Sequence, residues 1–111
     1  MSPLILKLSD GKYIIHTNDI ICLQASSNYT KLFLKGNRKF IMAAKTLKYF
    51  QALLPAGNFV RVHSSYLINI NHVQATHVPK TIFLSQNIEV PVSRRRSHIC
   101  ALLKPTCNAL A

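Results

Sequence analysis

FVRVHSSYLININHV, residues 59–73, is the stretch of this 111-residue chain that decides the fold. It is rich in β-branched and aromatic residues, which is typical of β-strands. Two serines interrupt it, so the pattern predicts two short strands joined at a polar corner. Arg61 and His63 share a face of the first strand if that strand is regular, because alternate side chains point the same way. We therefore expect Arg61, His63, Ser64 and Ser65 to meet at one exposed rim.

Short strands dominate the rest of the chain as well. Apolar or alternating runs between turn signals predict them at residues 4–8, 13–16, 20–25, 29–35, 38–43, 74–78, 81–84 and 88–92. Thr46 can cap a helix that ends at about Leu54, and Ser93 can cap a last helix from Arg94 to about Leu103. The sequence therefore predicts a mostly β chain with two short α-helices.

The length predicts one domain, residues 1–104, followed by a short C-terminal tail, residues 105–111. No apolar run approaches the about 18 residues that a membrane-spanning helix needs. The apolar start of the chain lacks a preceding basic segment and is interrupted by Lys7, so it does not resemble a signal peptide. We expect a cytoplasmic protein without a membrane span.

Charge is the strongest feature of the composition. The chain has 14 Lys and Arg against 3 acidic residues, a formal net charge of +11. Such a field favours a polyanionic partner, nucleic acid first and an anionic membrane surface second. The alternative is a basic protein without a polyanionic partner, because lysines on edge strands also serve to prevent aggregation.

Catalytic and metal-binding patterns are weak. The three cysteines form no CxxC pair, and the five histidines have no zinc-like spacing. Too few carboxylates are available to orient a Ser–His pair or to complete a metal site. No phosphate-binding glycine motif is present. We expect a protein that is not an enzyme, without catalytic residues, cofactor or metal.

Three consecutive arginines stand at the predicted start of the last helix, residues 94–96. A helix start favours acidic residues, so this run is unfavourable unless an anion lies nearby. A guanidinium is also the commonest reader of guanine in the DNA major groove. The run therefore indicates a phosphate or base contact, with a solvated cationic helix start as the alternative.

Residues 61–69, RVHSSYLIN, preceded by Phe59, resemble the signature of LytTR DNA-binding domains, Phe-x-Arg-x-His-x-Ser-x-x-x-Asn. Three further segments resemble that family in the same order, namely residues 19–21 with 28–29, residues 46–48 and residues 90–94. The resemblance extends over about residues 4 to 103. Gln24 departs from it, since members of the family commonly have Glu there. We expect a DNA-binding domain without an attached receiver.

The resemblance implies small antiparallel sheets stacked in an elongated, mostly β fold with two helices. It also implies that loops and strand ends, rather than a recognition helix, contact DNA. Carried over by position, the contacts come from the loop after the first long strand, the corner, and the last helix start. The expected DNA-binding residues are Asn28, Thr30, Lys31, Lys45, Arg61, His63, Ser64, Arg94, Arg95 and Arg96.

Within this set, Thr30, Ser64 and Arg94 are the candidates for base contacts. Phosphate contacts are expected from Lys45, Arg61, His63, Arg95 and Arg96. The implied function is sequence-specific binding of double-stranded DNA by a bacterial transcription regulator. The resemblance further implies paired direct repeats as the target, a separate signalling partner, and a monomer or weak dimer off DNA. The alternative is a basic RNA-binding or anionic-surface module, for which Tyr29 and Phe33 would have to stack on bases.

Overall fold

The described residues fold into three antiparallel sheets and one α-helix, so the prediction of a mostly β fold is confirmed. The structure is a computed structural model, which describes residues 3–8, 11–36, 40–77 and 81–96. The strands are β1 (Pro3–Leu8), β2 (Gly11–His16), β3 (Ile20–Ser26), β4 (Tyr29–Leu34), β5 (Phe40–Ala43), β6 (Phe59–His63), β7 (Tyr66–Asn69), β8 (Val73–His77), β9 (Thr81–Leu84) and β10 (Ile88–Pro91). The helix α1 is Leu47–Leu53, and 3-10 turns lie at Thr17–Asp19, Ile70–His72, Ser85–Asn87 and Arg94–Arg96.

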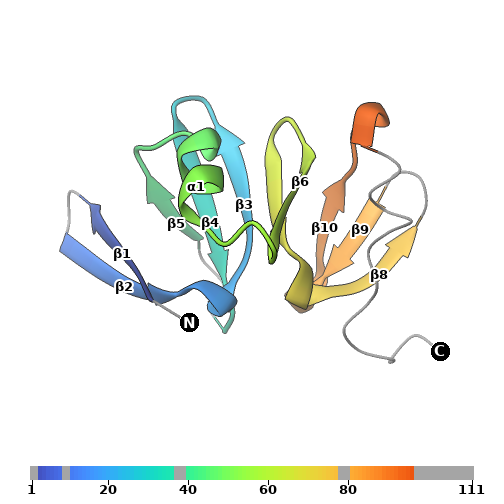
Figure 1. Ribbon diagram of the computed structural model, residues 1–111. Coiled ribbons are helices and arrows are strands. Elements are labelled where there is room, and N and C mark those ends of the chain that lie inside the picture. The colour runs from blue at the N-terminus through green and yellow to red at the C-terminus, as the bar shows by residue number, and fades with distance from the viewer. Residues whose placement is uncertain (1–2, 9–10, 37–39, 78–80, 97–111) are drawn as a thin grey trace.

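A five-stranded sheet of order β5-β4-β3-β7-β6 forms the centre of the molecule (Figure 1). The β1–β2 hairpin lies beyond one end of it, and a three-stranded sheet of order β10-β9-β8 lies beyond the other. The opening stretch of the sequence forms the β6–β7 hairpin, and its two serines form the turn, as predicted. We refer to residues 63–65 as the corner. The molecule is elongated, with extents of 41 × 27 × 23 Å.

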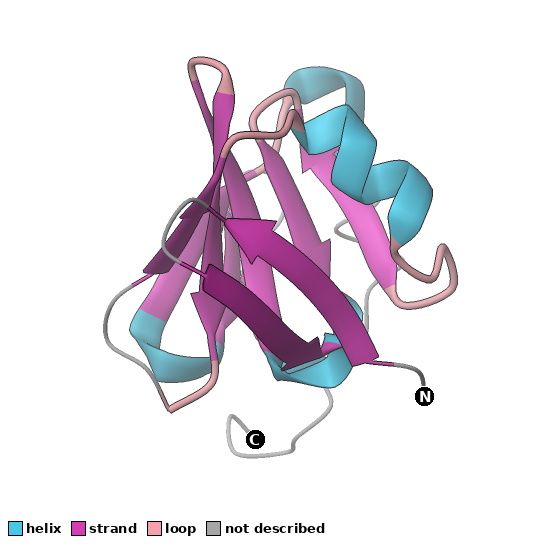
Figure 2. Ribbon diagram, turned by 90° about the vertical axis from the view of Figure 1, so that its left-hand side faces the viewer, coloured by secondary structure: helices cyan, strands magenta, loops and turns pink. Residues whose placement is uncertain are grey.

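Both faces of the five-stranded sheet are covered by apolar side chains. One face packs against α1, which Figure 2 shows on the outside of the sheet, and buries Leu23, Leu32, Phe50 and Leu67. The other face packs against β8–β10 and buries a second cluster that includes Ile68. Burial on both faces explains why β3 has a continuous apolar run instead of an alternating one.

A β-bulge in β6 changes which residues share a face. Arg61 pairs with Leu67, whereas His63 pairs with Tyr66, so one extra residue, Val62, enters the strand between them. Leu67 belongs to the cluster under α1, while Tyr66 packs against the cluster under β8–β10. The prediction that Arg61 and His63 share a face is therefore wrong, because the extra residue turns His63 to the other side.

A polar cluster connects the sheets at the end opposite to the corner. Asn69 is fully buried and donates to the carbonyl oxygen of Ile20 at 3.0 Å. Its own amide oxygen accepts the backbone N–H of Asn71 at 3.0 Å. His72 lies 2.7 Å from the carbonyl oxygen of Asn18 through Nε2 and 3.0 Å from the hydroxyl of Ser85 through Nδ1. Segments from β2–β3, β7–β8 and β9–β10 therefore meet at this cluster.

The first predicted helix is confirmed, and the second is described only at its start. Thr46 caps α1 through its hydroxyl, which accepts the N–H of Tyr49 at 3.3 Å. Arg94–Arg96 forms a single 3-10 turn, and the remainder of the predicted helix, residues 97–103, lies outside the described residues. The predicted tail, residues 105–111, also lies outside them. Within the described ranges, no helix has the length and apolar character needed to cross a membrane.

Candidate nucleic-acid interface

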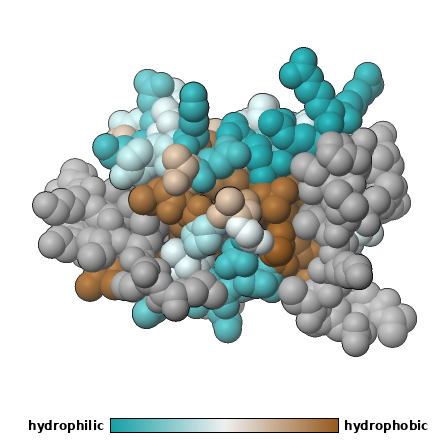
Figure 3. All heavy atoms as spheres, viewed as in Figure 1, coloured by the Kyte–Doolittle hydropathy of each residue, from teal (hydrophilic) through white to brown (hydrophobic). Residues whose placement is uncertain are grey.

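Three of the predicted contact segments lie along one edge of the molecule. The β3–β4 loop, the corner and the turn after β10 all lie on the upper edge in Figure 1, beside one end of α1. We call this edge the rim, and it comprises residues 27–31, Lys45, residues 61–65 and residues 93–96. Figure 3 shows that hydrophilic side chains line the upper edge of this face, above the apolar side chains. No acidic residue belongs to the rim.

Backbone hydrogen bonds join the three segments to one another. The N–H of Ala25, just before the first loop, donates to the carbonyl oxygen of Ser65 in the corner at 2.8 Å. The N–H of Ser93, just after β10, donates to the carbonyl oxygen of Val62 at 3.0 Å. The β6–β7 hairpin, which contains the corner, is therefore bonded on both sides, and these bonds hold the three segments next to one another.

The first loop exposes Asn28 and Tyr29 but buries Thr30. Thr30 is 0% exposed, and its hydroxyl donates to the carbonyl oxygen of Lys45 at 2.7 Å. The expectation that Thr30 contacts a base edge is therefore wrong for this conformation, because the side chain lies inside the protein. Asn28 is the exposed side chain of this loop with amide donors and acceptors for a base or phosphate.

The two predicted lysine contacts occupy different positions on the rim. Lys31 is half-buried, and its ammonium lies 4.7 Å from the centre of the Phe40 ring on the edge strand β5. Lys45 is exposed, with its ammonium 5.1 Å from the centre of the Tyr49 ring. Lys45 immediately precedes the capping residue of α1, at the rim end of the helix. Each ammonium thus lies over an aromatic ring, and the two lysines differ in exposure, so Lys45 is the more accessible to an anion at the rim.

The corner is held by the guanidinium of Arg61. Its Nε donates to the carbonyl oxygen of His63 at 2.9 Å, and its Nη2 donates to the carbonyl oxygen of Ser64. Its Nη1 donates to the side-chain oxygen of Gln51 on α1 at 2.8 Å. The expectation that Arg61 mainly faces phosphates is therefore too simple, because three of its five N–H donors bond within the protein.

His63 and Ser64 occupy different positions in the corner. The His63 ring contacts the Tyr66 ring edge-on, with 5.7 Å between centroids, and its Nδ1 accepts the N–H of Ser65 at 3.1 Å. That contact requires an unprotonated Nδ1 in this conformation. Ser64 is exposed, and its hydroxyl lies 3.4 Å from the same nitrogen. Ser64 thus supplies the accessible hydroxyl of the corner, whereas the His63 ring is held by Tyr66 and by the N–H of Ser65.

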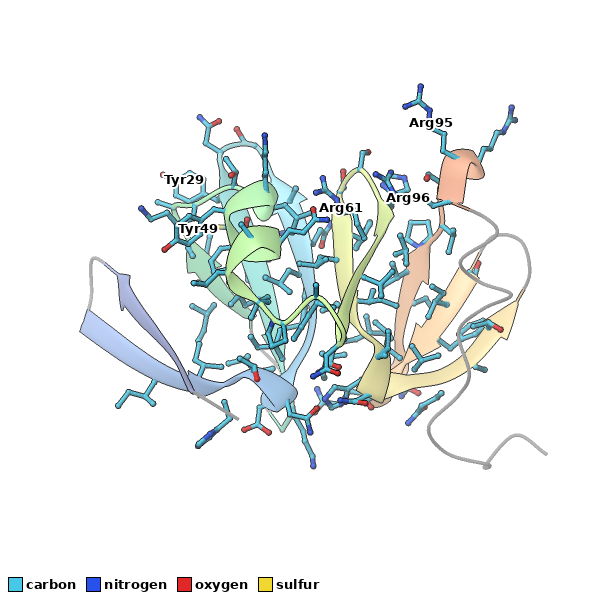
Figure 4. The ribbon with its side chains drawn as sticks, viewed as in Figure 1. Tyr29, Tyr49, Arg61, Arg95 and Arg96 are labelled. Carbon is cyan, nitrogen blue, oxygen red and sulfur yellow. The ribbon has the colours of Figure 1, made fainter. Side chains whose placement is uncertain are left out.

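The turn after β10 presents the arginine run at the end of the rim. Arg94 and Arg95 are exposed, and Figure 4 shows Arg95 projecting outward from the body of the molecule. Arg96 is half-buried. Burial, and secondly the positive charge of Arg96, lower the pKa of the Arg61 guanidinium. Cations of the corner and of this turn therefore lie close enough to repel each other, which an anion between them would relieve.

Gln51 is a residue of the site that the sequence patterns did not indicate. It lies on the exposed side of α1, where a polar residue is expected without any special function. Its bond to Arg61 joins residues ten positions apart on different elements, so no local spacing predicts it. Within the described residues, no group of three or more His, Cys, Asp or Glu side chains is arranged to hold a metal ion.

The chain matches a family model described as LytTr DNA-binding domain over residues 10–101. It is 26% identical over 98 residues to the sensory transduction protein LytT of Bacillus anthracis and to that of Bacillus cereus. Each alignment covers 85% of this chain and only 39% of the relative, so the chain spans well under half the length of these two proteins.

A solved structure gives the same result for the fold. The LytTr DNA-binding domain of a protein described as a methyl-accepting/DNA response regulator from Bacillus cereus superposes with a TM-score of 0.77. The sequences are 25% identical, and the superposition covers 93% of this chain and 96% of that domain. The similarity therefore extends over nearly the whole length of both chains.

Proposed function

Because the chain belongs to the LytTR family of DNA-binding domains, we propose that it binds specific sequences of double-stranded DNA and thereby regulates transcription. The observation that carries this proposal is the rim. Three segments without acidic residues lie along one edge and are bonded to one another through Ala25–Ser65 and Ser93–Val62. A basic edge of fixed shape suits a polyanionic duplex, whose phosphates supply most of the binding free energy.

We propose that the residues of the rim divide into base contacts and phosphate contacts, and we assign them by the exposure of their side chains. Asn28, Ser64 and Arg94 carry the base contacts, because each is an exposed hydrogen-bonding side chain in a different segment. Lys45, Arg95 and Arg96 bind phosphates, and the two free donors of Arg61 can add to them. Lys31 and His63 are assigned minor contributions, since both are half-buried and each has a partner in the protein.

We further propose that two copies bind paired direct repeats in the cytoplasm and that the free chain is a monomer or weak dimer. The net charge of +11 disfavours self-association in the absence of DNA, because like-charged copies repel each other. DNA removes that repulsion by neutralising the rim of each copy. Control of binding by a separate signalling partner is compatible with this arrangement, and it is tested by whether the isolated chain binds DNA without one.

The decisive experiment is selection of duplexes from a random pool at about 0.15 M salt, where much non-specific attraction is screened. Footprinting of the selected duplexes then locates the contacts. An enriched repeated motif supports the proposal, and the absence of enrichment refutes it. Competition with single-stranded RNA tests the alternative. Of the two aromatic residues that would have to stack on bases, Phe33 packs against the core and Tyr29 is exposed, so the support for it is reduced.

A further inference from the structure

We infer that Gln51, a residue of α1 outside the rim, is a positioning residue that fixes the conformation of the corner through Arg61. The inference rests on the proposed DNA-binding function, because its effect is on how the corner meets a duplex. It assigns to α1 a second role beside covering the sheet.

The geometry is a chain of three hydrogen bonds that converge on one guanidinium. The side-chain oxygen of Gln51 accepts Nη1–H of Arg61 at 2.8 Å, while Nε and Nη2 donate to the carbonyl oxygens of His63 and Ser64. The guanidinium is planar, so fixing one nitrogen fixes the directions of all its N–H bonds. Gln51 therefore determines the plane in which Arg61 meets both carbonyl groups of the corner.

On the side that faces α1, the corner has few restraints besides Arg61. It follows a β-bulge, where the ladder of β6 and β7 is interrupted, and Ser64 is exposed. Its other side is held by the bond from Ala25 to the carbonyl oxygen of Ser65 at 2.8 Å. Without Gln51, only the two bonds to the corner itself hold the guanidinium of Arg61, so it is no longer tied to α1 and the two carbonyl groups bond to a donor with more freedom.

Gln51 is not needed for the stability of α1 itself. The helix is anchored by Leu47 and Phe50, which are buried, whereas Gln51 is exposed. Alanine also has a higher helix propensity than glutamine. Replacing Gln51 with alanine therefore removes the contact to Arg61 without weakening the helix that presents it.

Because Arg61 is charged, the contact with Gln51 also affects the cationic surface beside the corner. The three internal bonds leave two N–H donors free, and the orientation of the guanidinium decides where these point. Arg96 contributes a second cation nearby, and its charge together with burial lowers the pKa of Arg61. A displaced Arg61 would therefore alter both the corner and the cationic surface beside it.

The test compares Gln51→Ala with Gln74→Ala, a matched control on the exposed surface of β8. Two quantities are measured, namely Kd for the selected duplex and for a random duplex, and amide hydrogen exchange at Ser65 in the free chain. Gln51→Ala should weaken the selected duplex about fivefold, roughly the effect of one weakened hydrogen bond, while affecting the random duplex much less. It should also speed exchange at Ser65, whose N–H bonds to His63, and leave Tm unchanged. Gln74→Ala should change none of these.

Two further variants distinguish positioning from a general surface effect. Gln51→Glu retains an acceptor for Arg61 and should restore slow exchange at Ser65. Arg61→Lys keeps the positive charge but replaces the planar guanidinium, which holds several N–H donors in fixed directions, with a single ammonium. Adding Gln51→Ala to this variant should therefore produce little further loss of affinity. Additive losses in that double variant would show that Gln51 does not act through Arg61.

Normal exchange at Ser65 in Gln51→Ala, or equal losses on both duplexes, would overturn the inference. If the unsubstituted chain selects no duplex at all, the proposed function fails instead. In that case, exchange at Ser65 in the free chain still decides whether Gln51 sets the corner.

Discussion

The hydroxyl of Thr30 donates a hydrogen bond to the carbonyl oxygen of Lys45 across 2.7 Å. This bond joins the beginning of β4 to the residue that precedes the capping residue of α1, and Thr30 is completely buried where it forms. The bond therefore connects the first loop to the cation that we propose as a phosphate contact, and Thr30 acts by supporting the rim from inside.

Thr30→Val should lower the free energy of unfolding by about 1–3 kcal/mol, because the carbonyl oxygen of Lys45 loses its buried donor. Thr30→Ser keeps the hydroxyl and should lose less. The measurement is chemical denaturation of both variants beside the unsubstituted chain. A larger effect of Thr30→Val on base preference than on stability would show that Thr30 reaches DNA after all.

Arg94→Ala should alter the sequence preference of binding, whereas Arg95→Ala should alter only the overall affinity, although both residues are exposed neighbours in one turn. Arg94→Ala should cost about 1–3 kcal/mol of binding free energy on the preferred duplex and relax the preference at one base pair. Arg95→Ala should weaken all duplexes alike and reduce the salt slope of log K by about one. Titration of both variants on the selected duplex and its single-base variants decides between the two roles. Equal losses on every duplex would contradict the assignment of Arg94.

Lys45→Ala should behave like Arg95→Ala, since its ammonium is exposed at the rim end of α1. Lys31→Ala is its matched control, because the ammonium of Lys31 also lies over an aromatic ring but the residue is half-buried. The expected result is a shallower salt dependence for Lys45→Ala and a smaller change for Lys31→Ala, measured as Kd at several salt concentrations. The reverse order would show that the ammonium of Lys31 leaves the ring when DNA binds.

Asn69→Ala should destabilise the chain by about 1–3 kcal/mol or more without altering the rim directly. The substitution removes the donor to the carbonyl oxygen of Ile20, a fully buried residue, and the side-chain oxygen that accepts the N–H of Asn71. Asn28→Ala, at the exposed loop, should instead leave stability unchanged and weaken DNA binding. Thermal denaturation and Kd of both variants separate the two effects, and similar stabilities would contradict the role of Asn69.

Burial raises the pKa of the Cys22 thiol from 9.0 to about 12, because the protein interior disfavours the thiolate. The corresponding stabilisation is therefore fully present below pH 9 and is lost as the pH rises towards 12. In a Cys100→Ser, Cys107→Ser background, Cys22 should resist iodoacetamide at pH 8 until denaturant is added. The free energy of unfolding should also fall above pH 9 relative to a Cys22→Val variant. Rapid labelling of the native chain would contradict this.

The sequence contained enough information to locate most of the strands and the capped helix. Thr46 caps α1 as its position before an apolar stripe predicts, and the two serines form the turn between β6 and β7. The burial of Thr30 was also accessible from the pattern. Leu32 and Leu34 alternate on one face of β4, and the same period of two places Thr30 on that face. Carried over by position, the resemblance instead places Thr30 in the loop that contacts DNA, although the period of two directs its side chain into the protein.

Two features could not be predicted from local sequence patterns, namely the bulge at Val62 and the bond between Gln51 and Arg61. No glycine or proline marks the bulge, and the extra residue is apparent only when β6 is set beside β7. Gln51 and Arg61 meet because α1 packs against the same face of the sheet that Arg61 occupies. Such pairing depends on the tertiary arrangement, so a single sequence without its fold does not contain a local signal for it.

The bulge in β6 separates two residues that stand only two positions apart in the sequence. Arg61 belongs to the environment of α1, whereas His63 belongs to the side of Tyr66 and the three-stranded sheet. Substitutions at the two positions therefore meet different neighbours, although the backbone of the corner, which Arg61 holds through the carbonyl oxygen of His63, still joins them. A signature that appears to be one motif thus presents its two basic side chains to two different parts of the protein.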